Sequence, residues 1–116
     1  MLLSDNSRDA QIKIIDFGLS RPFDANEAKK MQTVCGTHAY LSPELVQMVH
    51  GKIKGYGKEV DMWGIGLMTF IMLFGFNPFA RETQLRTHDA IDRLDWRFPK
   101  DVSVSPEAKD FMTQLL

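Results

Sequence analysis

The sequence predicts a mainly α-helical fold with a short β-hairpin at the N-terminus. The segment from Glu59 to Phe79 is almost wholly apolar and carries the start and stop signals of a long helix. Two Ser-Pro pairs, Ser42-Pro43 and Ser105-Pro106, are typical of helix starts, with serine as the N-cap and proline in the first turn. A short isoleucine-rich stretch near the N-terminus alternates in the manner of a strand.

The first fifteen residues predict the hairpin. Met1 to Leu3 is a short apolar piece, and Gln11 to Ile15 has the pattern of a half-buried strand. The polar residues Ser4 to Ala10 between them predict the connecting turn. The polar stretch from Leu19 to His38 has no clear periodicity, which inside a compact domain is typical of a functional loop.

The segment from Glu59 to Phe79 predicts the helix around which the other elements pack. Thr69 is its one polar side chain between Met62 and Phe76. A helix that is apolar on all sides belongs in the centre of a larger protein. This one is too short and too interrupted by glycine to cross a bilayer, which takes about 20 apolar residues.

Three further helices are predicted around this central one. The first spans Pro43 to Val49. The second spans Arg81 to Leu94, where charged residues of both signs predict an exposed, solvated helix. An extended link from Asp95 to Val104 leads to the third, which begins at Pro106. The predicted apolar face of this last helix consists of Phe111, Met112, Leu115 and Leu116.

Composition narrows the class of protein. The chain has 116 residues and a formal net charge of −1, so nothing in its charge favours binding to nucleic acid or to an anionic membrane. Its one cysteine excludes an internal disulfide framework and fits a reducing compartment. The N-terminus lacks the pattern of a signal peptide. We therefore expect a soluble, cytoplasmic protein.

The first chemical signal is Asp16-Phe17-Gly18, directly after the predicted hairpin. A carboxylate at the end of a strand, followed by glycine, is suited to hold a Mg2+ ion that bridges ATP phosphates. Three residues are a weak signal alone, because an aspartate often caps a loop. Three longer motifs follow in the chain: Gly36 to Glu44 (GTHAYLSPE), Asp61 to Gly66 (DMWGIG) and Gly75 to Phe79 (GFNPF).

In this order and spacing, the four motifs resemble a eukaryotic protein kinase catalytic domain, specifically its C-terminal lobe, over essentially all 116 residues. The resemblance implies that Asp16 binds Mg2+ and opens the activation segment. It implies that the packing of Phe17 distinguishes active from inactive states, with Gly18 completing this cofactor-binding element. By the same resemblance, the Thr37 hydroxyl helps to position the acceptor substrate and the catalytic base.

The resemblance assigns two structural roles and one regulatory role. Glu44 would pair with an arginine further along the chain, and Asp61 would accept backbone N–H bonds from the catalytic loop. The runs around Cys35 and from Gly57 to Trp63 are similar to the calcium/calmodulin-dependent kinases. In that group Thr33 would be the activation-loop phosphosite, where a phosphate adds about −1.5 to −2 charges. The alternative for Thr33 is an ordinary solvated loop threonine.

The resemblance also implies a partial kinase domain, residues 1–116, truncated at both ends. It would run from the activation segment through the helix after the substrate-lobe helix. The Gly-rich loop, the strand lysine and the catalytic-loop base of kinases have no counterpart in the sequence. We therefore expect part of a Ser/Thr protein kinase, which uses Mg2+ and ATP to phosphorylate proteins and is catalytically incomplete on its own. Its expected partner is a protein substrate or the remainder of a kinase domain.

Two alternatives remain open. The chain could be a non-catalytic kinase-lobe binding module, which would use exposed apolar surface to capture its partner. It could also be a gene-model fragment with no independent function. The remaining reactive side chains give no further site: Cys35 stands alone, and His38, His50 and His88 lack the spacing of metal ligands.

Overall fold

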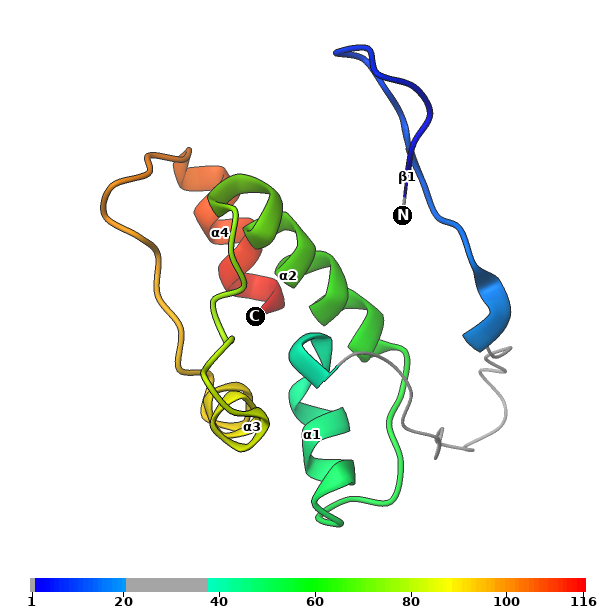
Figure 1. The fold of residues 1–116 in the computed structure, drawn as a ribbon, viewed down its shortest axis with the longest axis vertical. Coiled ribbons are helices and arrows are strands. Elements are labelled where there is room, and N and C mark those ends of the chain that lie inside the picture. The colour runs from blue at the N-terminus through cyan, green and yellow to red at the C-terminus, as the bar shows by residue number, and fades with distance from the viewer. Residues whose placement is uncertain (1, 21–37) are drawn as a thin grey trace.

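The computed structural model describes residues 2–20 and 38–116. In chain order these residues form a two-stranded sheet, two short 3-10 helices and four α-helices. In Figure 1 the hairpin lies to one side, and the four helices lie together. The predicted class, mainly α-helical with a short N-terminal hairpin, is confirmed.

The hairpin pairs β1 (Leu2–Leu3) with β2 (Ile12–Lys13) in antiparallel register, Leu2 opposite Lys13 and Leu3 opposite Ile12. β2 is shorter than the predicted range, Gln11 to Ile15. The prediction of a half-buried strand is wrong, because Ile12 and Ile14 are 58% and 69% exposed. Their side chains face solvent, since the described helices do not cover this hairpin.

The two Ser-Pro pairs start helices as predicted. In α1 (Pro43–Val49) the Ser42 hydroxyl accepts from the Leu45 N–H at 3.4 Å. In α4 (Pro106–Leu115) the Ser105 hydroxyl accepts from the Ala108 N–H at 3.1 Å. Each serine satisfies one of the backbone donors that a helix start leaves unpaired.

The long helix α2 (Glu59–Phe74) confirms the helix predicted from the apolar segment, and it ends at Gly75. The φ of Gly75 is 80°, a left-handed conformation that glycine adopts without strain. The other helices lie to one side of α2 in Figure 1, and part of its surface stays uncovered, as expected for a helix that belongs in the centre of a larger protein. The exposed α2 strip consists of four side chains that are 42% to 64% exposed: Met62, Ile65, Met72 and Leu73.

Helix α3 (Gln84–Asp92) is shorter than the predicted range, and it is not simply an exposed helix. It buries one face against α1 and against the 3-10 helix η2 (His38–Tyr40). Two polar residues, Thr87 and His88, belong to that buried face, whereas Leu85 is 65% exposed. The prediction of an exposed, solvated helix therefore holds for only part of α3.

The core lies between the helices. Trp63 on α2 lies beside Phe79, with 5.0 Å between the ring centroids. Phe70 is fully buried and meets Trp96 edge to face at 5.9 Å. In α4, Met112 is buried, but Phe111 is 46% exposed, so the predicted apolar face is wrong at Phe111. The main core cluster comprises Leu41, Leu45, Val46, Tyr56, Trp63, Leu67, Phe79, Ala90 and Ile91.

Candidate functional site

The candidate site begins at Asp16, two residues after Ile14 and just before the 3-10 helix η1 (Phe17–Leu19). Its φ of 64° and ψ of 75° are left-handed, a conformation that aspartate tolerates better than most residues with a side chain. Its Oδ1 accepts from the Gly18 N–H at 3.3 Å. The Phe17 side chain is 68% exposed. The chain thus holds the carboxylate out at a tight turn, where it is accessible.

A magnesium ion needs oxygen ligands in near-octahedral geometry and usually keeps several waters. The Asp16 carboxylate fits this chemistry as one ligand, because it is exposed and its Oδ1 bond leaves the second oxygen available. Within residues 2–20 and 38–116, no group of three or more His, Cys, Asp or Glu side chains is placed to hold a metal. The described chain therefore offers one ligand of such a site, not a closed site.

Two predicted site residues lie outside the described residues, the predicted phosphosite Thr33 and the predicted substrate-positioning Thr37. The lone Cys35, for which no site was predicted, lies outside them too. The described chain resumes at η2, which is hydrogen-bonded to the segment after α2. There the Asn77 amide donates from Nδ2 to the Ala39 carbonyl at 2.7 Å, and its Oδ1 accepts from the Phe79 N–H at 2.9 Å.

Glu44 and Asp61 occupy first turns of helices, where carboxylates are stabilised by the helix dipole. Glu44 on α1 is half-buried, and Asp61 on α2 is exposed. Neither carboxylate has a side-chain partner within the part of the chain that the structure describes. This arrangement is compatible with the predicted pairing roles and equally with ordinary helix-start residues.

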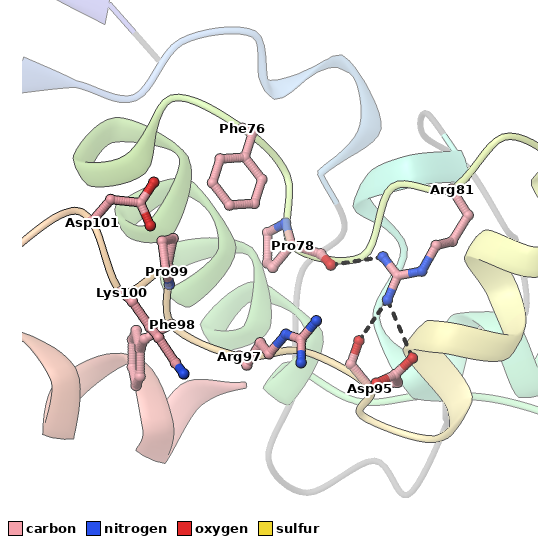
Figure 2. Close-up of a pocket in the computed structure, with 9 residues that line it drawn as sticks. All are labelled: Phe76, Pro78, Arg81, Asp95, Arg97, Phe98, Pro99, Lys100 and Asp101. Atoms are coloured by element: carbon pink, nitrogen blue, oxygen red, sulfur yellow. Dashed lines mark hydrogen bonds and ion pairs between the residues drawn. The ribbon is translucent and has the colours of Figure 1, made fainter.

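A groove of about 820 Å3 lies between the segment after α2 and the link that follows α3 (Figure 2). Arg81 crosses between its two walls. Its Nη1 donates to the carbonyls of Pro78 and Ala80 at 2.9 and 3.0 Å, and its Nη2 donates to the Asp95 carbonyl at 2.9 Å. The residues that line the groove are Phe76, Pro78, Arg81, Asp95, Arg97, Phe98, Pro99, Lys100 and Asp101.

The charged stretch around α3 is only partly the solvated face that the sequence predicted. Arg86 and Glu82 form an exposed pair, as expected. Asp92, in contrast, accepts from Lys52 Nζ at 2.6 Å and from Gln47 Nε2 at 3.0 Å, which fastens the end of α1 to α3. These bonds, the Lys52 bond first, lower the pKa of Asp92. Contacts between residues so far apart in sequence leave no signal in local charge patterning.

The comparisons with known proteins cover the whole chain. The family model described as protein kinase domain matches residues 1–116. The chain is 39% identical to myosin light chain kinase A of Dictyostelium discoideum, over 100% of this chain and 38% of that protein. It is 41% identical to the calcium/calmodulin-dependent protein kinase cmkB of Emericella nidulans, over 93% of this chain and 26% of that protein.

A third relative is the calcium/calmodulin-dependent protein kinase type I of Schizosaccharomyces pombe, 36% identical over 100% of this chain and 34% of that protein. The chain therefore spans well under half the length of these relatives. Among the described residues, no helix is both long and apolar enough to pass through a membrane.

Proposed function

Because the chain belongs to the protein kinase domain family, in the calcium/calmodulin-dependent group of Ser/Thr kinases, we propose that it is part of an enzyme that transfers the γ-phosphate of ATP to Ser or Thr side chains of proteins. The observation that carries the proposal is the match of the family model over all of residues 1–116. The accessible Asp16 carboxylate after β2 supports it.

The proposed role of Asp16 is to hold Mg2+ against the ATP phosphates. In phosphoryl transfer the protein contributes mainly positioning and electrostatic stabilisation, and bound Mg2+ neutralises charge on the phosphates. The Gly18 N–H bond to Oδ1 fixes one carboxylate oxygen and so orients the other. Phe17, being 68% exposed, is proposed to pack against residues outside this chain in the active arrangement.

We further propose that residues 1–116 form a partial domain, the C-terminal lobe of the kinase, and that a longer protein supplies the catalytic base and the ATP-binding lobe. The exposed α2 strip supports this, as do the exposed apolar side chains of the hairpin such as Leu3 and Ile14. Covering a large apolar side chain contributes roughly 1.5–3 kcal/mol. A matching surface on the rest of the domain would therefore add substantial stability.

Four further residues carry proposed roles by family resemblance. Thr33 is the proposed activation-loop phosphosite, and Thr37 is proposed to position the acceptor hydroxyl. Glu44 and Asp61 are proposed to bind an arginine and catalytic-loop N–H groups contributed by the longer protein. Glu44 and Asp61 lie in the first turns of α1 and α2. An intracellular, cytoplasmic location remains a prediction.

The test compares residues 1–116 with the longer protein encoded by the complete transcript, in phosphate transfer from Mg2+-ATP to Ser/Thr peptides. The longer protein is expected to be active, and Asp16→Asn is expected to lower its kcat/KM by at least about 100-fold, as loss of a key electrostatic group does. Asp9→Asn, an exposed carboxylate in the hairpin turn, is the matched control and should leave activity unchanged.

Residues 1–116 alone are expected to give no transfer. Transfer by these residues alone that disappears in Asp16→Ala would overturn the proposed incompleteness and keep the proposed reaction. A complete transcript in which unrelated sequence flanks residues 1–116, and whose product transfers no phosphate, would overturn the reaction itself.

A second candidate function is a non-catalytic binding module that captures a kinase or a kinase substrate. The observation that favours it is the exposed α2 strip, because neighbouring exposed apolar side chains on a chain that acts alone are typical of an interaction surface. Residues 1–116 that remain monomeric, folded and without a partner in solution would count against it.

A further inference from the structure

Three histidines from distant parts of the sequence meet where η2, the end of α1 and α3 come together. His88 lies in the middle. Its ring centroid is 5.5 Å from that of His38 on η2, at an interplanar angle of 48°. It is also 5.5 Å from that of His50, the C-cap of α1, at 57°. We call these three residues the histidine cluster.

The members of the histidine cluster differ sharply in exposure. His88 is 2% exposed, and its Nε2 is buried without a hydrogen-bond partner among the described residues. His38 and His50 are exposed. The Nδ1 of His38 is hydrogen-bonded to Gln84 Nε2 at 3.0 Å, one turn before His88 on α3. The central imidazole is therefore enclosed by its own helix and by two imidazoles that reach solvent.

A proton on His88 would be costly in this arrangement. A buried cation without a hydrogen-bond acceptor loses its hydration and gains nothing in return. His50 and His38, once protonated, repel that charge, and the carboxylate of Asp89 on α3 opposes them only in part. The pKa of His88 is lowered, mainly by burial and to a smaller extent by the charges of His50 and His38. The other charges at this junction, Lys52 and Asp92, are paired with each other at 2.6 Å.

The same side chain also holds three elements together. Helix α3 packs on α1 and on η2, and His88 is in contact with the histidine that each of them contributes. We propose that the histidine cluster is a proton-sensitive contact: protonation of His88 at mildly acidic pH loosens the packing of η2 and of the α1 C-terminus on α3. This device goes beyond the proposed kinase reaction and does not depend on it.

The direction of the pH dependence follows from the lowered pKa. His88 is neutral in the packed arrangement and takes up a proton more readily when that arrangement opens. The contribution of His88 to stability is therefore complete above the unfolded value of 6.5. It falls as the pH drops from 6.5 towards the lower pKa of the folded chain, and it is constant below that.

The test is an NMR titration of the imidazole Cε1 protons in residues 1–116, with urea unfolding measured at each pH. His88 is expected to titrate below 6.5. Two surface variants must shift its midpoint in opposite directions. His50→Gln removes a repelling charge and should raise the His88 titration midpoint by up to roughly half a pH unit, the effect of one unit charge on another at this separation in water. Asp89→Asn removes the attracting charge and should lower it.

His88→Phe provides the second readout, because an aromatic ring of similar width fills the site without titrating. As the pH is lowered from 6.5 to 5, the urea concentration at the unfolding midpoint should decrease for the original chain. For His88→Phe it should not change over this range. If His88→Phe does not fold, the opposite shifts of the His88 titration midpoint in His50→Gln and Asp89→Asn still test the proposal. An unshifted His88 midpoint in both surface variants, or the same pH slope in a folded His88→Phe, would overturn the proposal.

Discussion

Gly66 on α2 and Leu115 on α4 approach so closely that a Cβ added to the glycine would lie 2.7 Å from the Cβ of Leu115. The neighbouring atom is next to the backbone of α4, so it cannot move aside without moving the helix. Gly66→Ala should therefore push α4 away and lower the free energy of unfolding by about 1–3 kcal/mol, the usual cost of overpacking. Urea denaturation of the two chains measures the difference.

Gly64 provides the matched control one half-turn earlier on the same helix. A Cβ at this position meets nothing within 4 Å. Alanine is better than glycine in a helix interior by about 1 kcal/mol, so Gly64→Ala should stabilise the chain by about 0.5–1 kcal/mol. Equal effects of the two substitutions would mean that the close approach of α2 and α4 does not exist in solution.

Leu94 ends α3 in a strained conformation. Its φ is 52°, while its N–H donates to the Ile91 carbonyl at 3.1 Å and the Asp95 N–H donates to the Ala90 carbonyl at 2.8 Å. This is the Schellman pattern, with leucine at the position where glycine is usual. Leu94 is 50% exposed, so little packing is lost in Leu94→Gly. We expect this substitution to stabilise the chain by up to about 1 kcal/mol, because left-handed strain costs about 1–2 kcal/mol. Thermal unfolding checks it, and a lower Tm would contradict it.

The Arg81 guanidinium joins the two walls of the groove, because it donates hydrogen bonds to backbone carbonyls on both of them. Arg81→Ala leaves the part-buried Pro78 carbonyl without this donor, while water can replace it at the exposed Asp95 carbonyl, so the expected cost is about 1–2 kcal/mol. Arg86→Ala is the control, because Arg86 bonds only to Glu82 on the exposed face of α3. That loss should stay below about 0.5 kcal/mol. If urea unfolding gives similar losses for both, the groove walls are not held by Arg81.

The helices were predictable because their signals are local. Ser42 and Ser105 act as N-caps within three residues of their partners, and Gly75 ends α2 by its own backbone freedom. The face that a helix buries depends on its neighbours, which local patterning does not contain. Phe111 and Met112 are equally apolar in sequence, yet only Met112 meets the core. The isoleucines of the hairpin carry a strand pattern, and the described helices leave them uncovered.

The sequence predicted which residues belong to the candidate site, but not their conformation or contacts. The sequence singles out Asp16, but its left-handed backbone and the bond from the Gly18 N–H are visible only in the structure. The histidine cluster escaped prediction for a different reason. The three residues His38, His50 and His88 lie far apart in the sequence at no regular interval. They meet only because η2 and α1 pack on α3.

The ion pair between Lys52 and Asp92 predicts a second pH dependence, at lower pH than that of the histidine cluster. The bonds from Lys52 and Gln47 lower the pKa of Asp92 below 3.8, so the folded chain favours its charged form. The resulting stability is complete above the unfolded value and is lost as the pH falls through the lower folded pKa. Asp92→Asn should therefore flatten the dependence of the urea midpoint on pH between about 5 and 2. A urea midpoint that depends on pH as steeply in Asp92→Asn as in the original chain would show that the pair does not hold α1 to α3.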